Sequence, residues 1–284
     1  MNITLGNLHR DAINLLSHSS DSARLDAELL IAHVLVIPRT QFITQPDMAI
    51  ETQKLDQITA LIKQRKQGVP VAYLIGKQHF WDVELTVTKD TLIPRPETEL
   101  LVETALTLFS QQQPVDVVDL GTGSGAIAIA IAKARPGWNV LATDLASTTL
   151  NVAQQNARHY KLDNLQFEQG NWFEAINTNH RFDLIISNPP YVADNDPHLQ
   201  LGDVQHEPSH ALTSGPDGLN DIRYLVTNSH RYLNTDGWLM LEHGYDQGQQ
   251  VHELFESAGY SSITQRHDLA GHVRMTYAQW HIHG

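Results

Sequence analysis

The chain has 284 residues, of which 41% are hydrophobic and 18% charged, and this suits a globular protein with one large and one small domain. It has no cysteine, which excludes disulfides, thiolate metal sites and a cysteine nucleophile, and its sixteen histidines lack metal-ligand spacing, so we expect no metal. The net charge of −13 disfavours direct binding of nucleic acid. We find neither an apolar run long enough to span a bilayer nor a signal-peptide pattern, so we expect a cytoplasmic protein without membrane contact.

The first 75 residues are predicted to be helical. Asp21 can cap a first amphipathic helix, which Pro38 ends, and a second one stops before Gly68 and Pro70. A basic trio at the end of the second helix fits a solvated face that complements the helix dipole, with a partner contact as the alternative. The two apolar faces are Leu25, Leu29, Ala32, Val36 and Leu55, Ile58, Leu61, Ile62, and the basic trio is Lys63, Arg65 and Lys66.

The pattern changes near residue 78. Residues 79–87 alternate in polarity and are rich in β-branched side chains, which is typical of a strand. Together with Leu92-Ile93 this run is expected to form a hairpin that links two domains. A helix is then predicted to start near Pro96, with Glu97 and Glu99 beside its positive end. For Glu97 a helix-start acid and a substrate contact are equally good interpretations.

Beyond this helix, strands and helices alternate, which predicts a parallel sheet covered by helices on both faces. Two late alternating runs fit an antiparallel pair at the edge of that sheet. The expected strands are residues 116–120, 140–143, 166–168, 184–187 and 238–242, the expected helices are 126–134, 148–160, 221–233 and 247–258, and the edge runs are 262–267 and 273–280.

The sequence Asn188-Pro189-Pro190-Tyr191 is the most informative stretch of the chain. It follows an apolar run, residues 182–187, that reads as a buried parallel strand, so Asn188 is expected at the carboxyl edge of the sheet, where open α/β folds bind ligands. The two prolines stiffen the loop and leave carbonyl groups free to accept hydrogen bonds. A rigid loop with an Asn side chain, a free carbonyl and an aromatic face suits a planar NH2 group, on either a carboxamide or a nucleic-acid base.

A glycine loop lies upstream, where residues 117–125 run from a strand into Gly121-Thr122-Gly123-Ser124-Gly125 and then a helix. Glycines allow tight turning and close approach of backbone N–H groups to a ligand. Asp144 lies nineteen residues past Gly125 at the end of the next predicted strand, where its carboxylate can accept both hydroxyls of a ribose. Loop and acid together indicate a nucleoside ligand.

S-adenosylmethionine fits this pattern better than other nucleosides. The loop lacks the Gly-x-Gly-x-x-Gly of dinucleotide folds and the Gly-Lys-Ser/Thr of phosphate loops, and Asp119 would repel a pyrophosphate but can pair with an ammonium group. After the third strand, Asn171 can bond an adenine edge, and Trp172 can cover the adenine ring or simply pack at the rim.

These blocks together resemble the class I S-adenosylmethionine-dependent methyltransferases and, more narrowly, the HemK/PrmC family. The block Pro94–Glu99 and the block that runs from Glu207 to Leu219 are the most specific for that family. Asn188–Tyr191 is shared with adenine methyltransferases of nucleic acids. Asn171 is a departure, because relatives often carry an acid there. The matching blocks are Pro94-Arg95-Pro96-Glu97-Thr98-Glu99, residues 119–125, Asp144, Asn188–Tyr191, Glu207-Pro208 with Ala211-Leu212, Gly215, and Asp217-Gly218-Leu219.

The resemblance implies a Rossmann-like, mostly parallel seven-stranded sheet with an antiparallel edge, preceded by a small helical bundle and a β-hairpin. The implied domains are residues 1–77, which dock the substrate or only stabilise the fold, residues 78–94 as linker hairpin, and residues 95–284 as the methyltransferase domain. The implied activity is transfer of a methyl group from S-adenosyl-L-methionine to the side-chain amide nitrogen of the glutamine in the Gly-Gly-Gln motif of class I peptide-chain release factors, with S-adenosyl-L-homocysteine as product.

The resemblance also assigns roles to residues. Asn188, Pro189 and Tyr191 are expected to be catalytic, since Asn188 Oδ1 and the Pro189 carbonyl can accept the two N–H groups of the substrate amide while Tyr191 packs on its plane. Pro190 and Glu97 join them in the expected substrate site. The expected cofactor-binding residues are Gly121, Thr122, Gly123, Ser124, Gly125, Asp144, Asn171, Trp172 and Asn188.

Three other functions stay open at this point. An adenine N6-methyltransferase of nucleic acids would share Asn188–Tyr191, but it should carry a basic recognition region, and residues 1–80 contain only eight Lys or Arg against seven Asp or Glu. A non-catalytic nucleoside-binding scaffold would not need the intact Asn188–Tyr191 loop. A nicotinamide oxidoreductase would leave that loop unexplained.

Overall fold

The computed structural model describes residues 3–281, so residues 1–2 and 282–284 of the domain ranges expected above lie outside the described part. The chain divides into two compact units. Unit 1 comprises Met1–Lys77 together with Pro197–His206, and unit 2 comprises Gln78–Asp196 and Glu207–Gly284. A segment from the second half of the sequence therefore belongs with the N-terminal helices.

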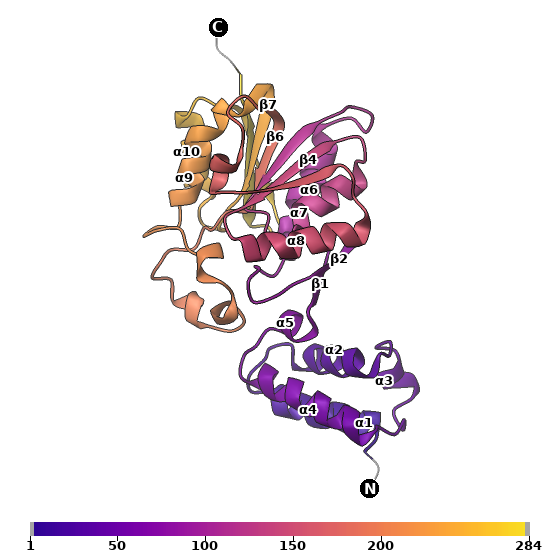
Figure 1. Ribbon diagram of the computed structural model, residues 1–284. Coiled ribbons are helices and arrows are strands. Elements are labelled where there is room, and N and C mark those ends of the chain that lie inside the picture. Colours follow the sequence, from indigo (N-terminus) through magenta and orange to yellow (C-terminus); the bar gives the residue numbers. More distant parts are fainter. Residues whose placement is uncertain (1–2, 282–284) are drawn as a thin grey trace. The chain divides into compact units, whose positions relative to one another are not determined.

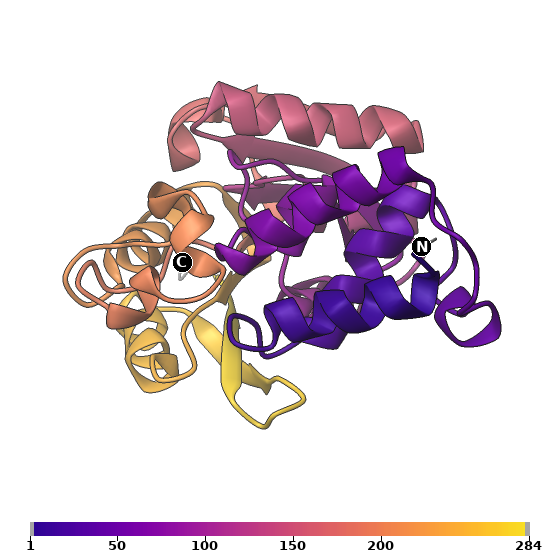
Figure 2. The same cartoon turned by 90° about the horizontal axis from the view of Figure 1, so that it is seen from below.

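Unit 1 is a bundle of helices that lie side by side (Figures 1 and 2), with α2 against both α1 and α4. Its buried core includes Leu5, Leu30, Ile31 and Ile58. Within the described residues no helix is both long enough and apolar enough to cross a membrane. The elements of this unit are α1 (Leu5–Leu16), α2 (Ala23–Leu35), α3 (Gln41–Thr44), α4 (Thr52–Lys66) and α5 (Val71–Ile75), with the short 3-10 helices η3 (Pro197–Gln200) and η4 (Val204–His206).

The prediction of which residues form the buried apolar face of α2 is wrong. Leu25 is 41% exposed and Val36 is 86% exposed, whereas Leu30 and Ile31 are fully buried. The helix carries apolar residues around most of its circumference, so spacing alone does not select the buried side, and packing between α1 and α4 does. Asp21 is not the cap either, because the N-cap position is occupied by Ser22.

The basic trio at the end of α4 was expected to form a solvated face, and this interpretation is wrong for Arg65. Its side chain is 7% exposed and forms an ion pair with the buried Asp26, with 2.6 Å between Arg65 Nε and Asp26 Oδ2. Arg65 also pairs with Asp203 of the 197–206 segment. A charge buried this deeply requires partners, and here they come from residues far away in the sequence.

A hairpin of two strands stands where a single strand was expected over residues 79–87. Strands β1 (Lys77–Phe80) and β2 (Val83–Thr86) pair with each other, and the chain reverses at Trp81-Asp82. Trp81 has φ of 53°, a conformation that is uncommon for a bulky residue, so no residue typical of turns marks this reversal of the chain. Leu92-Ile93 is not a strand, and the expectation that it pairs with residues 79–87 is wrong.

Unit 2 contains a seven-stranded sheet with the order β5-β4-β3-β6-β7-β9-β8 (Figure 1). Strands β5, β4, β3, β6 and β7 are parallel, and β9 runs antiparallel to both β7 and β8. This confirms the mostly parallel sheet with an antiparallel edge. The strands are β3 (Asp116–Leu120), β4 (Asn139–Asp144), β5 (Leu165–Gln169), β6 (Phe182–Ser187), β7 (Leu233–Glu242), β8 (Ser261–His267) and β9 (Val273–Gln279).

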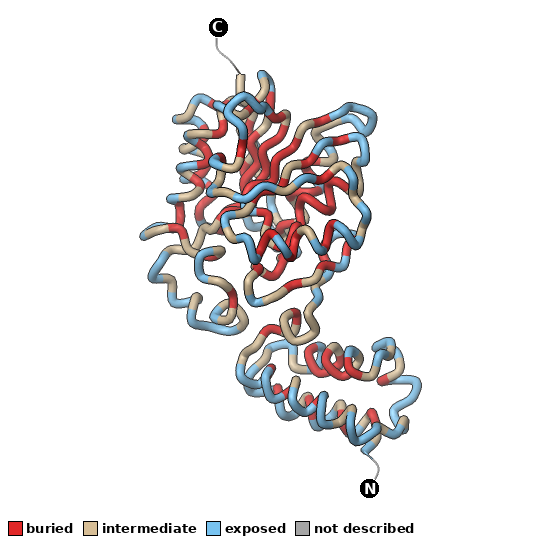
Figure 3. The backbone as a smooth tube through the Cα atoms, in the orientation of Figure 1, coloured by how far each residue is buried: buried red, intermediate tan, exposed pale blue. Residues whose placement is uncertain are grey.

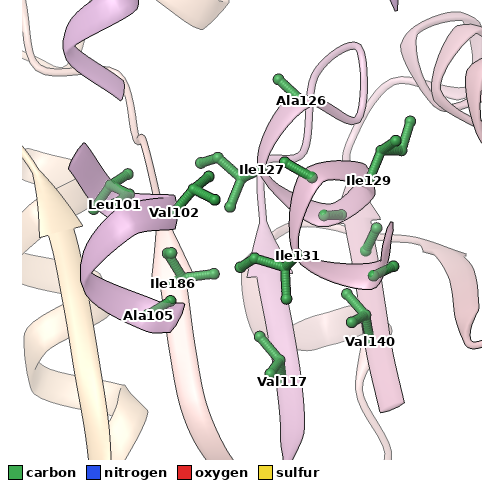
Figure 4. Close-up of a cluster of buried hydrophobic side chains, with 14 of the residues drawn as sticks. Leu101, Val102, Ala105, Val117, Ala126, Ile127, Ile129, Ile131, Val140 and Ile186 are labelled. Carbon is green, nitrogen blue, oxygen red and sulfur yellow. The ribbon is translucent and has the colours of Figure 1, made fainter. Parts of the chain in front are cut away.

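Helices cover both faces of the sheet, and the central strands are buried (Figure 3). Helices α6, α7 and α8 pack on one face, where Leu101 and Val102 of α6 and Ile127 and Ile131 of α7 point toward the strands (Figure 4). Helices α9 and α10 cover the other face. The helical segments of unit 2 are η1 (Pro96–Thr98), α6 (Glu99–Leu108), α7 (Ala126–Ala134), α8 (Ser147–Tyr160), η2 (Trp172–Ala175), η5 (Ser209–Ala211), α9 (Asn220–Asn228), η6 (Ser229–Arg231) and α10 (Gly248–Ser257).

The helix expected over residues 221–233 ends early. Helix α9 stops at Asn228, and Leu233 already belongs to β7, which pairs with Phe182. The Phe182 N–H donates to the Tyr232 carbonyl at 2.8 Å, so pairing with β6 takes over residues that local periodicity assigns to a helix. The sheet then shifts register between Phe182 and Leu184.

Candidate active site

An open cleft lies at the carboxyl ends of the central strands of unit 2. Segments that follow β3, β4, β5 and β6 line it, as expected where the strand order of an open α/β sheet reverses. The lining residues are Asp90, Leu92, Gly121, Gly123, Asp144, Leu145, Thr149, Gly170, Asn171, Trp172, Asn188, Pro190, His210, Ala211 and Asp221.

The glycine loop folds tightly under this cleft. Gly121 and Gly123 have φ of 73° and 58°, which favour glycine, and a Cβ at Gly121 would lie 3.3 Å from the Trp172 ring. Gly125 also has positive φ, and a Cβ there would lie 2.8 Å from Ile129. The first two glycines thus keep the cleft floor open, and the third lets the loop pack on its own helix.

Asp144 closes the loop at the end of β4. Its Oδ2 accepts from the Gly123 N–H at 3.0 Å and its Oδ1 accepts from the Ala146 N–H at 3.0 Å. Burial raises the pKa of Asp144, and the hydrogen bonds from these N–H groups oppose that rise. The carboxylate is therefore fixed at the cleft wall, and the lone pairs that the backbone does not use can accept further hydrogen bonds.

Asp119 lies deeper, at the end of β3, and is 1% exposed. Its Oδ2 accepts from Thr122 Oγ1 at 2.6 Å and from the Ala128 N–H at 3.2 Å, and burial raises its pKa to about 7. Among the described residues, Asp119 Oδ1 has no hydrogen-bond partner. This acid therefore supports the loop from below and keeps one oxygen unsatisfied.

Trp172 is held in place by Asp221. The indole N–H donates to Asp221 Oδ1 at 3.1 Å, and Asp221 Oδ2 accepts from Ser214 Oγ at 2.6 Å. Trp172 has φ of 50°, so its backbone is strained to present the ring toward Gly121. An aromatic ring fixed over the glycine loop is suited to contact a flat base, and the neighbouring Asn171 lines the same cleft.

The Asn188–Tyr191 loop leaves β6 and is supported from behind. The N–H groups of Tyr191 and Val192 both donate to the Leu212 carbonyl, at 3.1 and 2.9 Å, and Gln247 Nε2 donates to the Tyr191 carbonyl at 2.9 Å. Gly218 packs so closely that a Cβ there would lie 2.2 Å from the Tyr191 carbonyl oxygen. The Asp217-Gly218-Leu219 block thus keeps the loop in position.

Two side chains of this loop make defined contacts. Asn188 Nδ2 donates to Thr98 Oγ1 at 3.0 Å, and the Tyr191 hydroxyl donates to Glu242 Oε1 at 3.1 Å. Within the described part of the chain no hydrogen bond is formed to Asn188 Oδ1 or to the Pro189 carbonyl. Burial raises the pKa of the Tyr191 hydroxyl, so this group is a neutral donor.

Glu207 ties the two most family-specific blocks together. Its carboxylate accepts from the Ile93 N–H at 3.0 Å and pairs with Arg95. The Glu207 side chain is fully buried, so the segment before η1 is anchored to the segment that contributes His210 and Ala211 to the cleft. The sequence marked both blocks as specific for the family, and the fold shows that they are in contact.

The structure brings seven of the expected site residues to one cleft. Gly121, Gly123, Asp144, Asn171, Trp172, Asn188 and Pro190 line it, whereas Thr122, Ser124, Gly125, Pro189, Tyr191 and Glu97 do not. Sequence reasoning missed Asp90, Thr149, His210 and Asp221 as lining residues. Only Asp221, an acid at a predicted helix start, carried any local signal, and a structural capping role explains such an acid equally well.

Comparison with known proteins identifies the family. Residues 7–76 match the model of the PrmC N-terminal domain, and residues 96–215 match that of the methyltransferase small domain. A release factor glutamine methyltransferase of Aliivibrio fischeri is 42% identical over 273 residues, which cover 96% of each chain. A protein of the same name from Pseudomonas aeruginosa is 45% identical and covers 92% of this chain and 94% of its own.

The chain belongs to the release factor glutamine methyltransferase family. Solved structures agree on the fold of this family member. A methyltransferase from Pyrococcus furiosus aligns with a TM-score of 0.53 and 18% identity over 79% of this chain and 98% of its own. An rRNA methyltransferase of T. Thermophilus, whose structure contains AdoMet and guanosine, aligns with a TM-score of 0.50 and 18% identity over 72% of this chain and 49% of its own.

Proposed function

We propose that this protein transfers the methyl group of S-adenosylmethionine to the side-chain amide nitrogen of the glutamine in the Gly-Gly-Gln motif of class I peptide-chain release factors. One observation carries the proposal: the amide of Asn188 and the carboxylate of Asp144 line the same cleft, in a chain of this family. An amide-binding loop and a nucleoside-binding loop that share one cleft allow donor and acceptor to meet.

The residues of the cleft fit S-adenosylmethionine. Gly121 and Gly123 leave room that side chains would fill, Asp144 offers acceptors for ribose hydroxyls, and Trp172 offers a face for adenine. The unsatisfied Asp119 Oδ1 suits a cationic or N–H donor better than a phosphate. When bound, S-adenosylmethionine would supply a methyl group on a sulfonium, which leaves as a neutral thioether.

The chain's own residues act on the acceptor amide. Its nitrogen is a weak nucleophile because the lone pair is delocalised into the carbonyl. Asn188 Oδ1 and the Pro189 carbonyl are free to accept its two N–H groups, which would aim the nitrogen and stabilise the positive charge that develops on it. The new N–C bond forms as the methyl leaves sulfur, and the alkylated nitrogen then loses a proton to water, so no strong base is needed.

Tyr191 contributes a fixed surface. Its hydroxyl is bound to the buried Glu242, and the Leu212 and Gln247 contacts hold its backbone. Its ring can therefore pack on the planar amide without losing further side-chain freedom. Pro190 lines the cleft beside it, and Glu97 is proposed to meet the substrate peptide outside the cleft.

For the protein partner, we assign docking to unit 1. Unit 1 has its own core, exposes Leu25, Val36 and Ile43, and lacks the basic excess that a nucleic-acid substrate requires. The alternative, an adenine N6-methyltransferase of nucleic acids, is not favoured, because the relatives that cover nearly the whole chain are named for release factors.

Mass spectrometry of a purified release factor incubated with this protein and S-adenosylmethionine tests the proposal. We expect one methyl group on the Gly-Gly-Gln glutamine and none on a release factor in which that glutamine is alanine. Asn188→Ala should reduce turnover by ~10²–10³ because it removes one electrostatic contact to the reacting nitrogen. Methyl transfer to DNA or tRNA, with none to the release factor, would overturn the proposal.

A further inference from the structure

Asp221 lies in the first turn of α9, but its side chain does not cap that helix. The N-cap position is occupied by Leu219, whose side chain has no hydrogen-bonding group. Both carboxylate oxygens of Asp221 have partners outside the helix. Oδ1 accepts from the Trp172 indole N–H at 3.1 Å, and Oδ2 accepts from Ser214 Oγ at 2.6 Å. The carboxylate therefore connects two segments that are distant in the sequence, which a capping acid does not do.

The anchor behind Asp221 is buried and is held at several points. Ser214 is 3% exposed, and its hydroxyl also accepts from the Asp221 N–H at 2.8 Å. The Ser214 N–H donates to the Val192 carbonyl at 2.9 Å, and the Ser214 carbonyl accepts from the Asn220 N–H at 3.2 Å. These contacts leave the Asp221 carboxylate little freedom, so its Oδ1 stays directed toward Trp172.

Trp172 requires such a contact because its backbone conformation is unfavourable. Its φ is 50°, and a residue other than glycine keeps a left-handed conformation only where the surrounding structure enforces it. The ring lies so close to the glycine loop that a Cβ at Gly121 would be 3.3 Å from it. A hydrogen bond from the indole N–H to a carboxylate is charge-assisted and directional, so it can fix the ring in this place.

We propose that Asp221 is a positioning residue that holds the Trp172 ring, through its indole N–H, where the adenine of S-adenosylmethionine binds. The inference rests on the proposed function, in which Trp172 offers a face for adenine. A ring that is already fixed does not have to be ordered on binding, and ordering a side chain costs affinity. Asp221 also lines the cleft, so a direct contact with the cofactor is the alternative that the experiment has to separate.

Substitutions distinguish these two roles. Asp221→Leu keeps the branched shape of the side chain and removes both acceptors. Asp221→Asn keeps one acceptor for the Trp172 N–H, and its NH2 group can donate to Ser214 Oγ. Trp172→Phe keeps an aromatic ring and removes the N–H that Asp221 binds. Glu174→Leu is the matched control, because it removes an exposed acid from the same 3-10 helix as Trp172 and this acid does not line the cleft.

The experiment measures affinity for S-adenosylhomocysteine by calorimetry, without a release factor, and combines Asp221→Leu and Trp172→Phe in a double-mutant cycle. We expect Asp221→Leu to weaken binding ~10-fold in the presence of Trp172, which is the factor that ordering one side chain on binding costs. In the Trp172→Phe background the same change should alter the affinity by less than ~2-fold. Asp221→Asn and Glu174→Leu should bind as tightly as the wild type.

Three outcomes in these variants would overturn the proposal. The first is an Asp221→Leu affinity equal to that of the wild type. The second is an equal loss with Trp172 and with Trp172→Phe, which would assign a direct cofactor contact to Asp221. The third is an Asp221→Asn variant as weak as Asp221→Leu, which would assign the loss to charge.

Two further results are kept apart from these. If Asp221→Leu does not fold, Ser214→Ala takes its place in the cycle, because it frees the second oxygen of Asp221 and should weaken binding only where Trp172 is present. A wild-type protein that binds no S-adenosylhomocysteine overturns this inference together with the proposed function. One that binds it but methylates no release factor refutes the proposed function alone, because no release factor enters the measurement.

Discussion

Gly218→Ala should separate catalysis from stability. Gly218 has φ of +75°, and a Cβ there would lie 2.2 Å from the Tyr191 carbonyl oxygen and 2.9 Å from Gln247 Nε2. Ordinary van der Waals contact begins at 3.4 Å, so the Tyr191 carbonyl has to move by about 1 Å, a displacement that matters for a reacting group. The Gln247 end is a flexible side chain and can move aside at little cost.

Two effects with known magnitudes follow from this substitution. The left-handed backbone costs a non-glycine residue about 1–2 kcal/mol. A displacement of the Asn188–Tyr191 loop by about 1 Å should reduce turnover by ~10², because the substrate amide would no longer face the methyl group correctly. The stability loss is moderate, and the activity loss is much larger than unfolding alone would cause.

The matched control is Gly271→Ala, in the turn between β8 and β9. Gly271 has φ of +84°, but a Cβ there would meet no atom within 4 Å, so it carries the backbone cost without the clash. The assays are urea unfolding and methylation of a release factor at saturating substrate. Equal turnover of the two variants would refute the reasoning, because it would mean that the Gly218 contact does not hold the loop.

Two further predictions concern buried charges. Arg65→Met leaves Asp26 buried without its ion pair and should lower the free energy of unfolding, measured by urea denaturation, by about 3 kcal/mol. The control Lys66→Met changes an exposed residue and should alter that free energy by less than about 0.5 kcal/mol. Similar values for both variants would contradict the buried ion pair. Burial raises the pKa of Glu242 from its ordinary value of 4.5 to about 7. Between these pH values the folded protein therefore holds a proton that the unfolded chain has released, and stability falls as the pH rises through this window. Glu242→Gln should flatten that pH dependence of stability in part, since Asp119 titrates in the same range, and an unchanged slope would contradict the assignment.

Local sequence determined the central sheet and the ligand loops. Apolar runs marked β3 and β6, and each loop follows its strand directly, so the sheet carries both to the same edge. The glycine spacing and the position of Asp144 placed one wall of the cleft, where we propose that the nucleoside binds, and the Asn188–Tyr191 loop placed another, where we propose that the acceptor amide binds. These features were predictable because chemistry and strand end lie within a few residues of each other.

Tertiary structure decided what depends on distant residues. The buried face of α2, the burial of Arg65, the hairpin turn at Trp81 and the early start of β7 each follow from contacts that local periodicity does not encode. The same holds for Thr98 and Asn188, which meet across ninety residues. Burial penalises unpaired polar groups, and only the folded chain determines which distant partners satisfy them.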